Sequence, residues 1–333
     1  MQYAKLGRTD IEVSRICLGC MGFGDAQTGQ HSWTLGEDDS RAIIKRALDA
    51  GITFFDTSMA YQAGSSERFV GRALRDLARR EDVVIATKFM PRAPEELAQG
   101  VTPAEHIARC LDASLERLGT DYVDLYIYHI WDWTMPVEEV MAALDGAVRA
   151  GKVRAIGFSN CRSWQLAQAN CIADERGWTR VSSYQGHYNA LFREDDREMN
   201  LYCRMEDVSI TPYSSLAAGR LARKPGEGGT KRFEQDAYAH SKYDATGEAD
   251  NVVIARVAKI AEHRGVSMTE VALAWSLAHA TAPIAGATKP HHIDGAVAAT
   301  ELALTPEEIA SIDEPYVPHP YVGVMAENLP PKR

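Results

Sequence analysis

The stretch ITFFD, residues 52–56, sets a carboxylate directly after a short apolar run. Two further stretches have the same design: VVIATK, residues 83–88, ends in a lysine, and VDLYIYH, residues 123–129, ends in a histidine. Apolar runs of this length, rich in β-branched and aromatic residues, predict short buried strands. Because a buried charge is costly without a partner, we expect the three polar side chains to lie close together at neighbouring strand ends.

Short apolar strands and longer amphipathic helices alternate along the chain. We expect strands near 16–20, 53–56, 83–88, 123–128, 153–158, 181–185, 208–212 and 283–286. We expect helices near 38–50, 66–80, 103–118, 136–150, 162–176, 195–205, 252–264 and 290–299. Eight alternations favour an α/β fold in which parallel strands close into a (β/α)₈ TIM barrel. The alternative is a doubly wound open sheet, but the glycines of residues 19–24 lead into a polar loop rather than the helix that such a sheet requires.

The chain of 333 residues has the composition of an ordinary globular protein, with 45% hydrophobic and 25% charged residues. Barrels of this size commonly form one domain, so we expect a single domain over residues 1–333. Three additions to the barrel are expected: an N-terminal β-hairpin at 1–15, a long glycine-rich loop after strand 7 at 217–250, and an extended C-terminal tail at 315–333.

Charge and apolar patterning narrow the possible partners and location. The net charge of −10 disfavours a nucleic-acid surface, which is usually basic. No apolar run is long enough to span a bilayer, and the N-terminus lacks a secretory signal, so we expect a cytoplasmic protein with reduced cysteines. We expect no metal, because the adjacent His291 and His292 have no cysteine or carboxylate at ligand spacing.

Polar residues follow seven of the expected strands, and in a closed barrel functional groups collect at the carboxyl ends of strands. Tyr61 lies five residues after Asp56, in the loop that follows the same strand. If the strand ends are neighbours, Asp56, Tyr61, Lys88 and His129 meet in one pocket. This combination suits proton transfer to a carbonyl oxygen.

Six short motifs occur in order along the chain. They are FDTSMAY (55–61), ATK (86–88), YH (128–129), GFSN (157–160), YQ (184–185) and YSSL (213–216). Together they resemble the aldo-keto reductase superfamily, most closely its bacterial branch related to the potassium-channel β subunits. The resemblance covers the chain from Leu6 to about Leu304. It implies an NAD(P)H-dependent oxidoreductase that interconverts C=O and CH–OH, here a carbonyl reductase acting on an aldehyde or ketone.

The resemblance assigns four catalytic residues. Tyr61 is expected to be the general acid that protonates the carbonyl oxygen. A free phenol is a weak acid at neutral pH, so the charge of Lys88 is expected to stabilise its anion, and Asp56 to hold Lys88 in place. His129 is expected to orient the carbonyl by a hydrogen bond. The hydride itself comes from the reduced nicotinamide.

The resemblance also implies a site for NADP(H). The expected cofactor-binding residues are Met21, Asp56, Ser159, Asn160, Gln185, Tyr213, Ser214, Leu216, Gly219, Lys224, Gly286, Thr288, Lys289 and His292. Tyr213 would stack on the nicotinamide, and Thr288 with Lys289 would bind the 2′-phosphate at a helix N-terminus, which favours NADP over NAD. A charge on His292 would make that binding pH-sensitive. Gly295 and Ala296 replace the usual adenosine contacts, which predicts weaker affinity.

The loops after the first, second and fourth strands are expected to shape the substrate pocket. They bring Phe23, Trp33, Trp131 and Trp133, an aromatic wall that suits aryl aldehydes and sugar faces alike. The sequence therefore predicts a small carbonyl substrate without selecting one, and it leaves the oligomeric state open. Two alternatives to the reductase are a cofactor-sensing regulatory subunit with slow turnover and a barrel scaffold that merely retains the residues.

Overall fold

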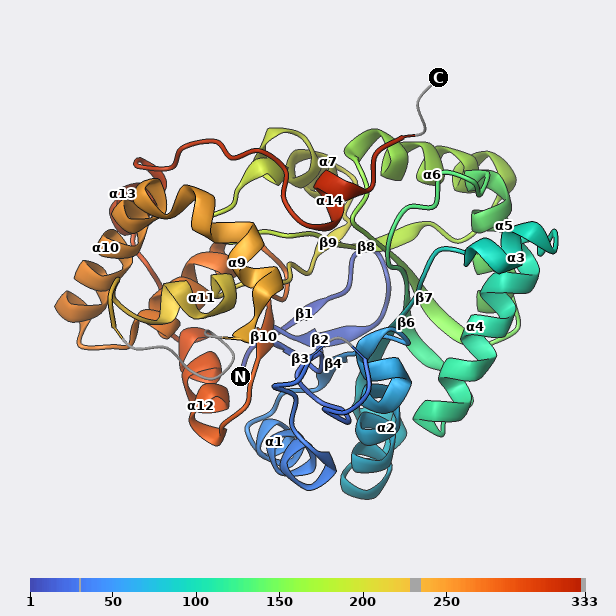
Figure 1. Ribbon diagram of the computed structural model, residues 1–333, viewed down its shortest axis with the longest axis horizontal. Coiled ribbons are helices and arrows are strands. Elements are labelled where there is room, and N and C mark those ends of the chain that lie inside the picture. The colour runs from blue at the N-terminus through green and yellow to red at the C-terminus, as the bar shows by residue number, and fades with distance from the viewer. Residues whose placement is uncertain (30, 228–234, 331–333) are drawn as a thin grey trace.

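The computed structural model describes residues 1–29, 31–227 and 235–330, and it contains one curled sheet of eight parallel strands (Figure 1). The strand order is β10-β3-β4-β5-β6-β7-β8-β9, so neighbours in sequence are neighbours in the sheet. The strands are β3 (Cys17–Gly19), β4 (Phe54–Asp56), β5 (Val84–Phe89), β6 (Val123–Tyr128), β7 (Val153–Ser159), β8 (Val181–Gln185), β9 (Ser209–Ile210) and β10 (Ile284–Gly286).

Backbone hydrogen bonds join the two ends of this sheet. The N–H of Thr281 donates to Ile210 O at 2.8 Å, and the N–H of Ile284 donates to Pro212 O at 2.9 Å. These bonds bring β10 alongside β9 and complete a TIM-barrel-like fold. The predicted (β/α)₈ class is confirmed, and the open doubly wound sheet is excluded.

Helices surround the sheet on its outer side (Figure 1). They are α1 (Glu37–Asp49), α2 (Ser65–Leu77), α3 (Pro94–Ala98), α4 (Pro103–Leu118), α5 (Val137–Arg149), α6 (Ser163–Arg176), α7 (Met199–Met205), α9 (Ala237–Tyr243), α10 (Gly247–Arg264), α11 (Met268–His279), α12 (Pro290–Ala299), α13 (Pro306–Asp313) and α14 (Val324–Glu327). The expected helix ranges do not include the short helices α3, α9 and α14, nor the longer α11 and α13. Helices α11 and α13 both begin with a capping box, from Ser267 to Glu270 and from Thr305 to Glu308, which is the signal that could have located them.

A short hairpin covers one end of the barrel. Strands β1 (Tyr3–Lys5) and β2 (Glu12–Ser14) pair antiparallel, and Leu6, Ile11 and Val13 pack in one apolar cluster with barrel residues such as Phe54. The Gly7 N–H donates to Ser209 Oγ at the start of β9. The hairpin therefore covers the amino ends of the strands, opposite to the polar strand ends.

The 217–250 segment and the C-terminal tail pack over the second half of the barrel (Figure 1). The segment contains a 3₁₀ turn at Ala217–Ala222 and helix α9, while residues 228–234 lie outside the described part of the chain. In the tail, His319 Nε2 lies 2.9 Å from Asp250 Oδ1, and Asn328 Nδ2 donates to Trp131 O at 2.7 Å. Residues 331–333 likewise lie outside the described part.

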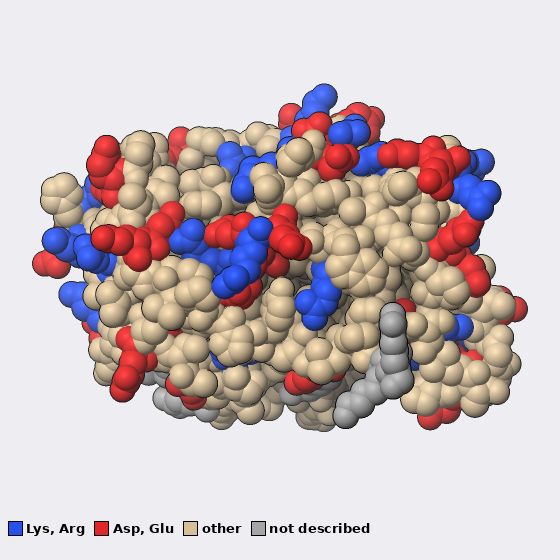
Figure 2. Space-filling view, turned by 90° about the horizontal axis from the view of Figure 1, so that it is seen from above, with Lys and Arg blue, Asp and Glu red and all other residues tan. Residues whose placement is uncertain are grey.

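The surface carries charges of both signs. On the face above α7 and α14, lysine and arginine side chains are interspersed with aspartate and glutamate (Figure 2). Mixed charge of this kind keeps a protein soluble without creating a strong field of one sign. Among the helices of the described ranges, none has both the length and the apolar character needed to cross a membrane.

Candidate active site

A buried lysine lies at the centre of the carboxyl-terminal strand ends. Lys88, near the end of β5, is 0% exposed, and its Nζ has three acceptors. These are Asp56 Oδ2 at 2.6 Å, the backbone oxygen of Thr57 at 2.7 Å and Tyr61 OH at 3.0 Å. Three bonds use all three ammonium protons, which offsets the cost of burial. Burial by itself lowers the pKa of Lys88, but Asp56 and Tyr61 together raise it above its ordinary value, so Lys88 is charged at neutral pH.

Asp56 is held on both carboxylate oxygens. Its Oδ2 accepts from Lys88, and its Oδ1 accepts from Gln185 Nε2 at 2.9 Å. Asp56 ends β4, next to β5, and Gln185 ends β8 on the far side of the closed barrel. Because the strands are parallel, both residues lie at the same end of the barrel and can meet there. Gln185, expected to bind the nicotinamide carboxamide, therefore also fixes the carboxylate and keeps its Oε1 available.

Tyr61 is carried on a constrained turn, the 3₁₀ segment Tyr61–Gly64. The next residue, Gln62, has φ 47° in the left-handed region, which is costly for a residue other than glycine. Its buried side chain compensates by tying down the loop before α1: Nε2 donates to Asp25 O at 2.8 Å, and Oε1 accepts the His31 N–H at 2.9 Å. Gly29 must be glycine here, because it has φ +78° and a Cβ would lie 2.6 Å from Gln62 Cα. Sequence reasoning missed Gln62, since glutamine in a polar loop carries no pattern.

The phenol of Tyr61 remains protonated at neutral pH. Burial is the largest influence and raises its pKa, Lys88 lowers it, and Asp56 raises it again, so that the net pKa lies above the ordinary value. The expected stabilising effect of Lys88 is present, but it does not outweigh burial. Because the phenol oxygen accepts from Lys88, its own hydrogen can point toward another acceptor.

His129 follows β6 and lies beside Tyr61, with ring centroids 6.0 Å apart and an interplanar angle of 84°. Burial, and then the charge of Lys88, hold the pKa of His129 well below its usual range, so the ring is neutral. Its Nδ1 lies 3.2 Å from Ser58 Oγ, which also accepts the Ala60 N–H. The serine hydroxyl hydrogen is therefore available to Nδ1, an arrangement that favours a hydrogen on Nε2. A neutral imidazole with Nε2–H can donate to a carbonyl oxygen.

Amide side chains connect this group to Tyr213. Asn160 Nδ2 donates to the backbone oxygen of His129 at 3.0 Å and to Ser159 Oγ at 2.8 Å, and Asn160 Oδ1 accepts from Tyr213 OH at 2.9 Å. The ring of Tyr213 is stacked on His187 with centroids 5.5 Å apart. The structure thus brings together the predicted carboxamide residues and the predicted stacking tyrosine around the four predicted catalytic residues.

The turn at residues 214–219 contains the expected cofactor-binding residues Ser214, Leu216 and Gly219. It has the conformation of an anion-binding turn, but not all of its backbone N–H groups are available. Ser214, Ala217, Ala218 and Gly219 all have positive φ, a geometry that turns backbone N–H groups to one side. The Gly219 N–H, however, donates to Leu216 O at 2.8 Å. This N–H is therefore engaged within the turn.

Lys224 lies beyond this turn, after the 3₁₀ segment. Its N–H donates to Glu227 Oε2 at 3.0 Å, and its side chain is exposed. The chain folds back on itself there, so the backbone of Lys224 is engaged within the loop. Lys224 can therefore contact a ligand through its exposed side-chain ammonium but not through its backbone N–H.

Thr288 and Lys289 lie at the N-terminus of α12, where backbone amides and the helix dipole favour an anion. The Thr288 N–H donates to His292 Nδ1 at 3.2 Å. Burial, and then His291 and Lys289, lower the pKa of His292 to about 4. His292 is therefore neutral at neutral pH, whereas the predicted pH sensitivity requires a charged ring. Gly286 pairs with Gly19, so β10 adjoins the loop that contains Met21.

The predicted aromatic wall is only partly correct. Trp131, Trp133 and Trp164 form a triangle in which each pair of ring centroids is 6.4 Å apart. Trp164, in the first turn of α6, is 52% exposed and was missed, because a tryptophan at a helix start gives no strand-end signal. Trp33 is almost buried and lies close to Gly22. Phe23 is fully buried, so it packs in the core and does not line a pocket.

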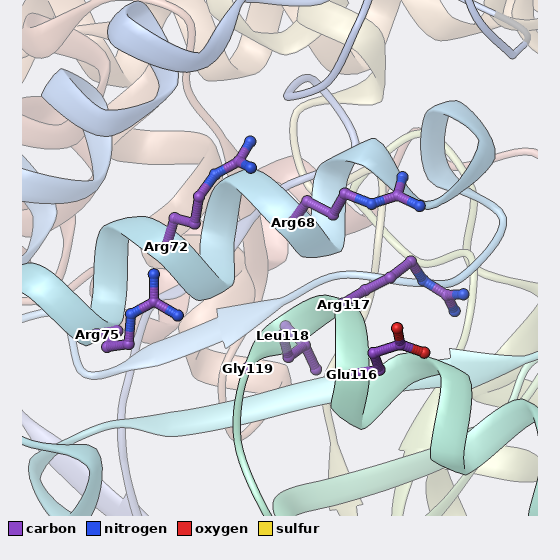
Figure 3. A pocket seen from close by; sticks show the side chains of 7 residues that line it. All are labelled: Arg68, Arg72, Arg75, Glu116, Arg117, Leu118 and Gly119. Atoms are coloured by element: carbon purple, nitrogen blue, oxygen red, sulfur yellow. The ribbon is translucent and has the colours of Figure 1, made fainter.

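A cavity of about 340 Å³ lies elsewhere, between α2 and α4 in the outer layer (Figure 3). Its lining residues are Arg68, Arg72, Arg75, Glu116, Arg117, Leu118 and Gly119. Arg72 Nη2 is 2.7 Å from Glu37 Oε2, and Arg117 is paired with Glu67. Arg72 and Arg117 thus have carboxylate partners, and the cavity is separate from the strand ends. Within the described ranges, no three histidine, cysteine, aspartate or glutamate residues gather as a metal site.

Comparison with known proteins agrees with this geometry. The model of the aldo/keto reductase family matches residues 15–316, so the chain belongs to that family and is an NAD(P)H-dependent oxidoreductase with a TIM-barrel-like fold.

The chain is 39% identical to a versiconal hemiacetal acetate reductase of Aspergillus parasiticus, covering 96% of this chain and 98% of the relative. It is 35% identical to a putative aryl-alcohol dehydrogenase of Schizosaccharomyces pombe, covering 96% and 97%. It also resembles the crystal structure of the thermostable aldo-keto reductase Tm1743 in complex with the inhibitor epalrestat. That likeness has a TM-score of 0.76 and 27% identity, and covers 95% of this chain and 100% of the other. Both curated relatives are fungal, whereas the sequence motifs suggested a bacterial branch.

Proposed function

We propose that this protein is an NADPH-dependent carbonyl reductase in which Tyr61 protonates the oxygen of an aldehyde or ketone. The observation that carries the proposal is the contact of Tyr61 OH with Lys88 Nζ at 3.0 Å, while Lys88 is itself held by Asp56 at 2.6 Å. A buried phenol joined to a charged ammonium is a proton donor whose anion has a stabilising partner in place.

Each residue has a distinct part in the reaction. The nicotinamide supplies the hydride when it is bound. The Nε2–H of His129 donates to the carbonyl oxygen and orients it. Tyr61 transfers its hydrogen to the same oxygen as negative charge develops there, and Lys88 stabilises the phenolate that remains. Asp56 keeps Lys88 charged and fixed, so the site does not reorganise during the reaction.

The cofactor site fits a phosphorylated dinucleotide. In this proposal Gln185 Oε1 and Ser159 Oγ hydrogen-bond the carboxamide, and Tyr213 offers a ring for stacking. Lys289 with the amides at the start of α12 supports a 2′-phosphate and hence NADPH. Gly295 and Ala296 are expected to make no contacts with the adenosine. In this proposal the affinity for that end of the cofactor therefore depends mainly on the charge of its 2′-phosphate.

The substrate we propose is an aromatic carbonyl compound. The triangle of Trp131, Trp133 and Trp164 provides a broad apolar surface in the loop after His129 and at the start of the next helix. The relatives named for an aryl alcohol and for versiconal hemiacetal acetate support this substrate class. We further propose that residues 1–333 act as one domain in the cytosol. The relation to the channel-subunit branch, with its slow cofactor-sensing role, stays the second candidate and predicts tight binding with little turnover.

The proposal is tested by Tyr61→Phe, which removes the hydroxyl alone. We expect kcat for an aromatic aldehyde to fall by about 10²–10⁴-fold, with the NADPH dissociation constant nearly unchanged. Tyr3→Phe is the matched control, because Tyr3 is 45% exposed in the N-terminal hairpin. Equal turnover of Y61F and Y3F would overturn the assignment.

A further inference from the structure

Three aromatic rings form a stack that ends at Tyr213, the ring expected to contact the nicotinamide. The rings of Phe192 and His187 have centroids 4.2 Å apart and planes 9° from parallel. The rings of His187 and Tyr213 have centroids 5.5 Å apart and planes 16° from parallel. Near-parallel, offset contacts of this kind are a favoured geometry of flat side chains. His187 is common to both contacts and links Phe192 to Tyr213, and the sequence motifs assigned it no role.

The backbone places His187 and Tyr213 side by side. His187 comes two residues after the end of β8, and Tyr213 comes three residues after the end of β9. The two residues form an isolated parallel bridge, and the Tyr213 N–H donates to Gly186 O at 2.9 Å. The pairing of β8 with β9 thus continues past both strands, and paired residues point their side chains to the same face. Main-chain bonds therefore fix His187 relative to Tyr213.

A hydrogen bond fixes the rotation of the His187 ring within its own plane. Its Nε2 lies 2.7 Å from Tyr243 OH, which also accepts from Asn189 Nδ2 at 3.0 Å. His187 is buried, and burial, followed by the charges of Lys242 and His319, holds the pKa of its ring well below the usual range. The ring is therefore neutral.

The second nitrogen of this ring is unusual for a buried position. Among the described residues, His187 Nδ1 has no hydrogen-bond partner. A buried polar atom without a partner lowers stability, and an apolar side chain at this place would avoid that cost. A flat ring that carries this cost, yet is stacked against two rings and held at one edge, points to a role beyond packing.

We propose that His187 is a positioning residue for the nicotinamide and acts through Tyr213. The hydroxyl of Tyr213 donates to Asn160 Oδ1 at 2.9 Å, which holds the far end of the tyrosine, while His187 supports its ring. With both contacts in place the tyrosine ring cannot tilt freely, so a nicotinamide stacked on it keeps a fixed plane. The inference rests on the proposed function, because it requires that the nicotinamide stack on Tyr213.

Two variants separate the ring of His187 from its hydrogen bond. His187→Phe keeps a flat ring and loses the bond to Tyr243, whereas His187→Gln keeps a side-chain amide for that bond and loses the ring. Titration calorimetry measures the dissociation constants of two probes. Reduced nicotinamide mononucleotide carries the nicotinamide end of the cofactor alone, and adenosine 2′,5′-bisphosphate carries the other end.

Loss of the ring is expected to affect the nicotinamide end only. We expect H187Q to raise the dissociation constant of the mononucleotide by about three- to tenfold, the size of one aromatic contact, and to leave that of the bisphosphate unchanged. H187F is expected to stay within about twofold of the unmodified protein for both probes. The control His263→Gln makes the same exchange at an exposed position on α10 and is expected to change neither constant.

Phe192→Leu tests the same stack without altering His187. It removes the flat ring next to His187 and is expected to raise the constant of the mononucleotide by about twofold. An unchanged constant in H187Q or F192L, an equal loss of both probes, or an equal loss in H187F and H187Q would each overturn the positioning role. If the unmodified protein binds both probes but turns over no aldehyde, the proposed function fails while these titrations still decide the role of His187. If it binds neither probe, both proposals fail.

Discussion

Replacing Lys88 with methionine removes the charge on which the centre of the site depends. The substitution breaks the three hydrogen bonds of Nζ and leaves Asp56, 2% exposed, without its cation. Removing one partner of a buried ion pair costs about 3–5 kcal/mol, because the remaining charge is neither solvated nor paired. Gln185 still donates to Asp56 Oδ1, so we expect the lower end of this range, about 3 kcal/mol.

The assay is equilibrium unfolding in urea, with the midpoint and slope measured for each variant. Lys45→Met is the control, since Lys45 and Asp49 form an exposed pair at 2.6 Å that should contribute less than about 1 kcal/mol. The double variant Lys88→Met with Asp56→Asn removes both charges and is expected to recover more than half of the loss. A loss below about 1 kcal/mol in K88M, or a double variant as unstable as the sum of its single changes, would refute the buried-pair account.

Four further outcomes are expected. Gln62→Ala should release the loop before α1, lowering stability by about 1–3 kcal/mol and increasing amide exchange across residues 25–31; unchanged exchange would count against the anchoring role. His129 has a folded pKa well below 6.5 and takes up its proton more readily when unfolded, so stability should fall as the pH drops below about 6.5. His129→Gln should reduce that slope in urea titrations, and an identical slope contradicts a neutral, half-buried ring. Because the pKa of His292 is about 4, NADPH affinity should stay level from pH 8 to about pH 6, and a break within that range in isothermal titrations would contradict its neutrality. Trp164→Ala should raise KM for aromatic aldehydes more than for short aliphatic ones, and an equal rise for both would remove this residue from the substrate surface.

The barrel and the meeting of the four proposed catalytic side chains could be predicted because their signals are local and repeat. Each buried strand is a short apolar run. A polar residue such as Asp56 or His129 stands at the end of the run and marks the end of the strand. Parallel register then brings the strand ends to one edge without any further information. Helices α11 and α13 were not predicted from apolar periodicity. Their clearest local signal is the capping box at the start of each helix.

Features that depend on distant contacts could not be predicted from the same patterns. Gln62 is a polar loop residue whose importance appears only when Asp25 and His31 fold against it. Lys242 is buried on α9, a helix that contacts the loop after β8 through Tyr243 and His187. The pKa directions of Tyr61 and His292 also required burial, which outweighs the charge of Lys88 at Tyr61 and acts in the same direction as His291 and Lys289 at His292.

The central claim is tested most directly by titrating the purified protein with NADPH and then adding an aromatic aldehyde while the absorbance of the reduced nicotinamide is followed. The account predicts saturable NADPH binding, weaker NADH binding, and steady loss of the absorbance with repeated turnover. Saturable binding followed by no loss of absorbance with any aldehyde in a broad aromatic and aliphatic panel would contradict a reductase and favour a cofactor-sensing role.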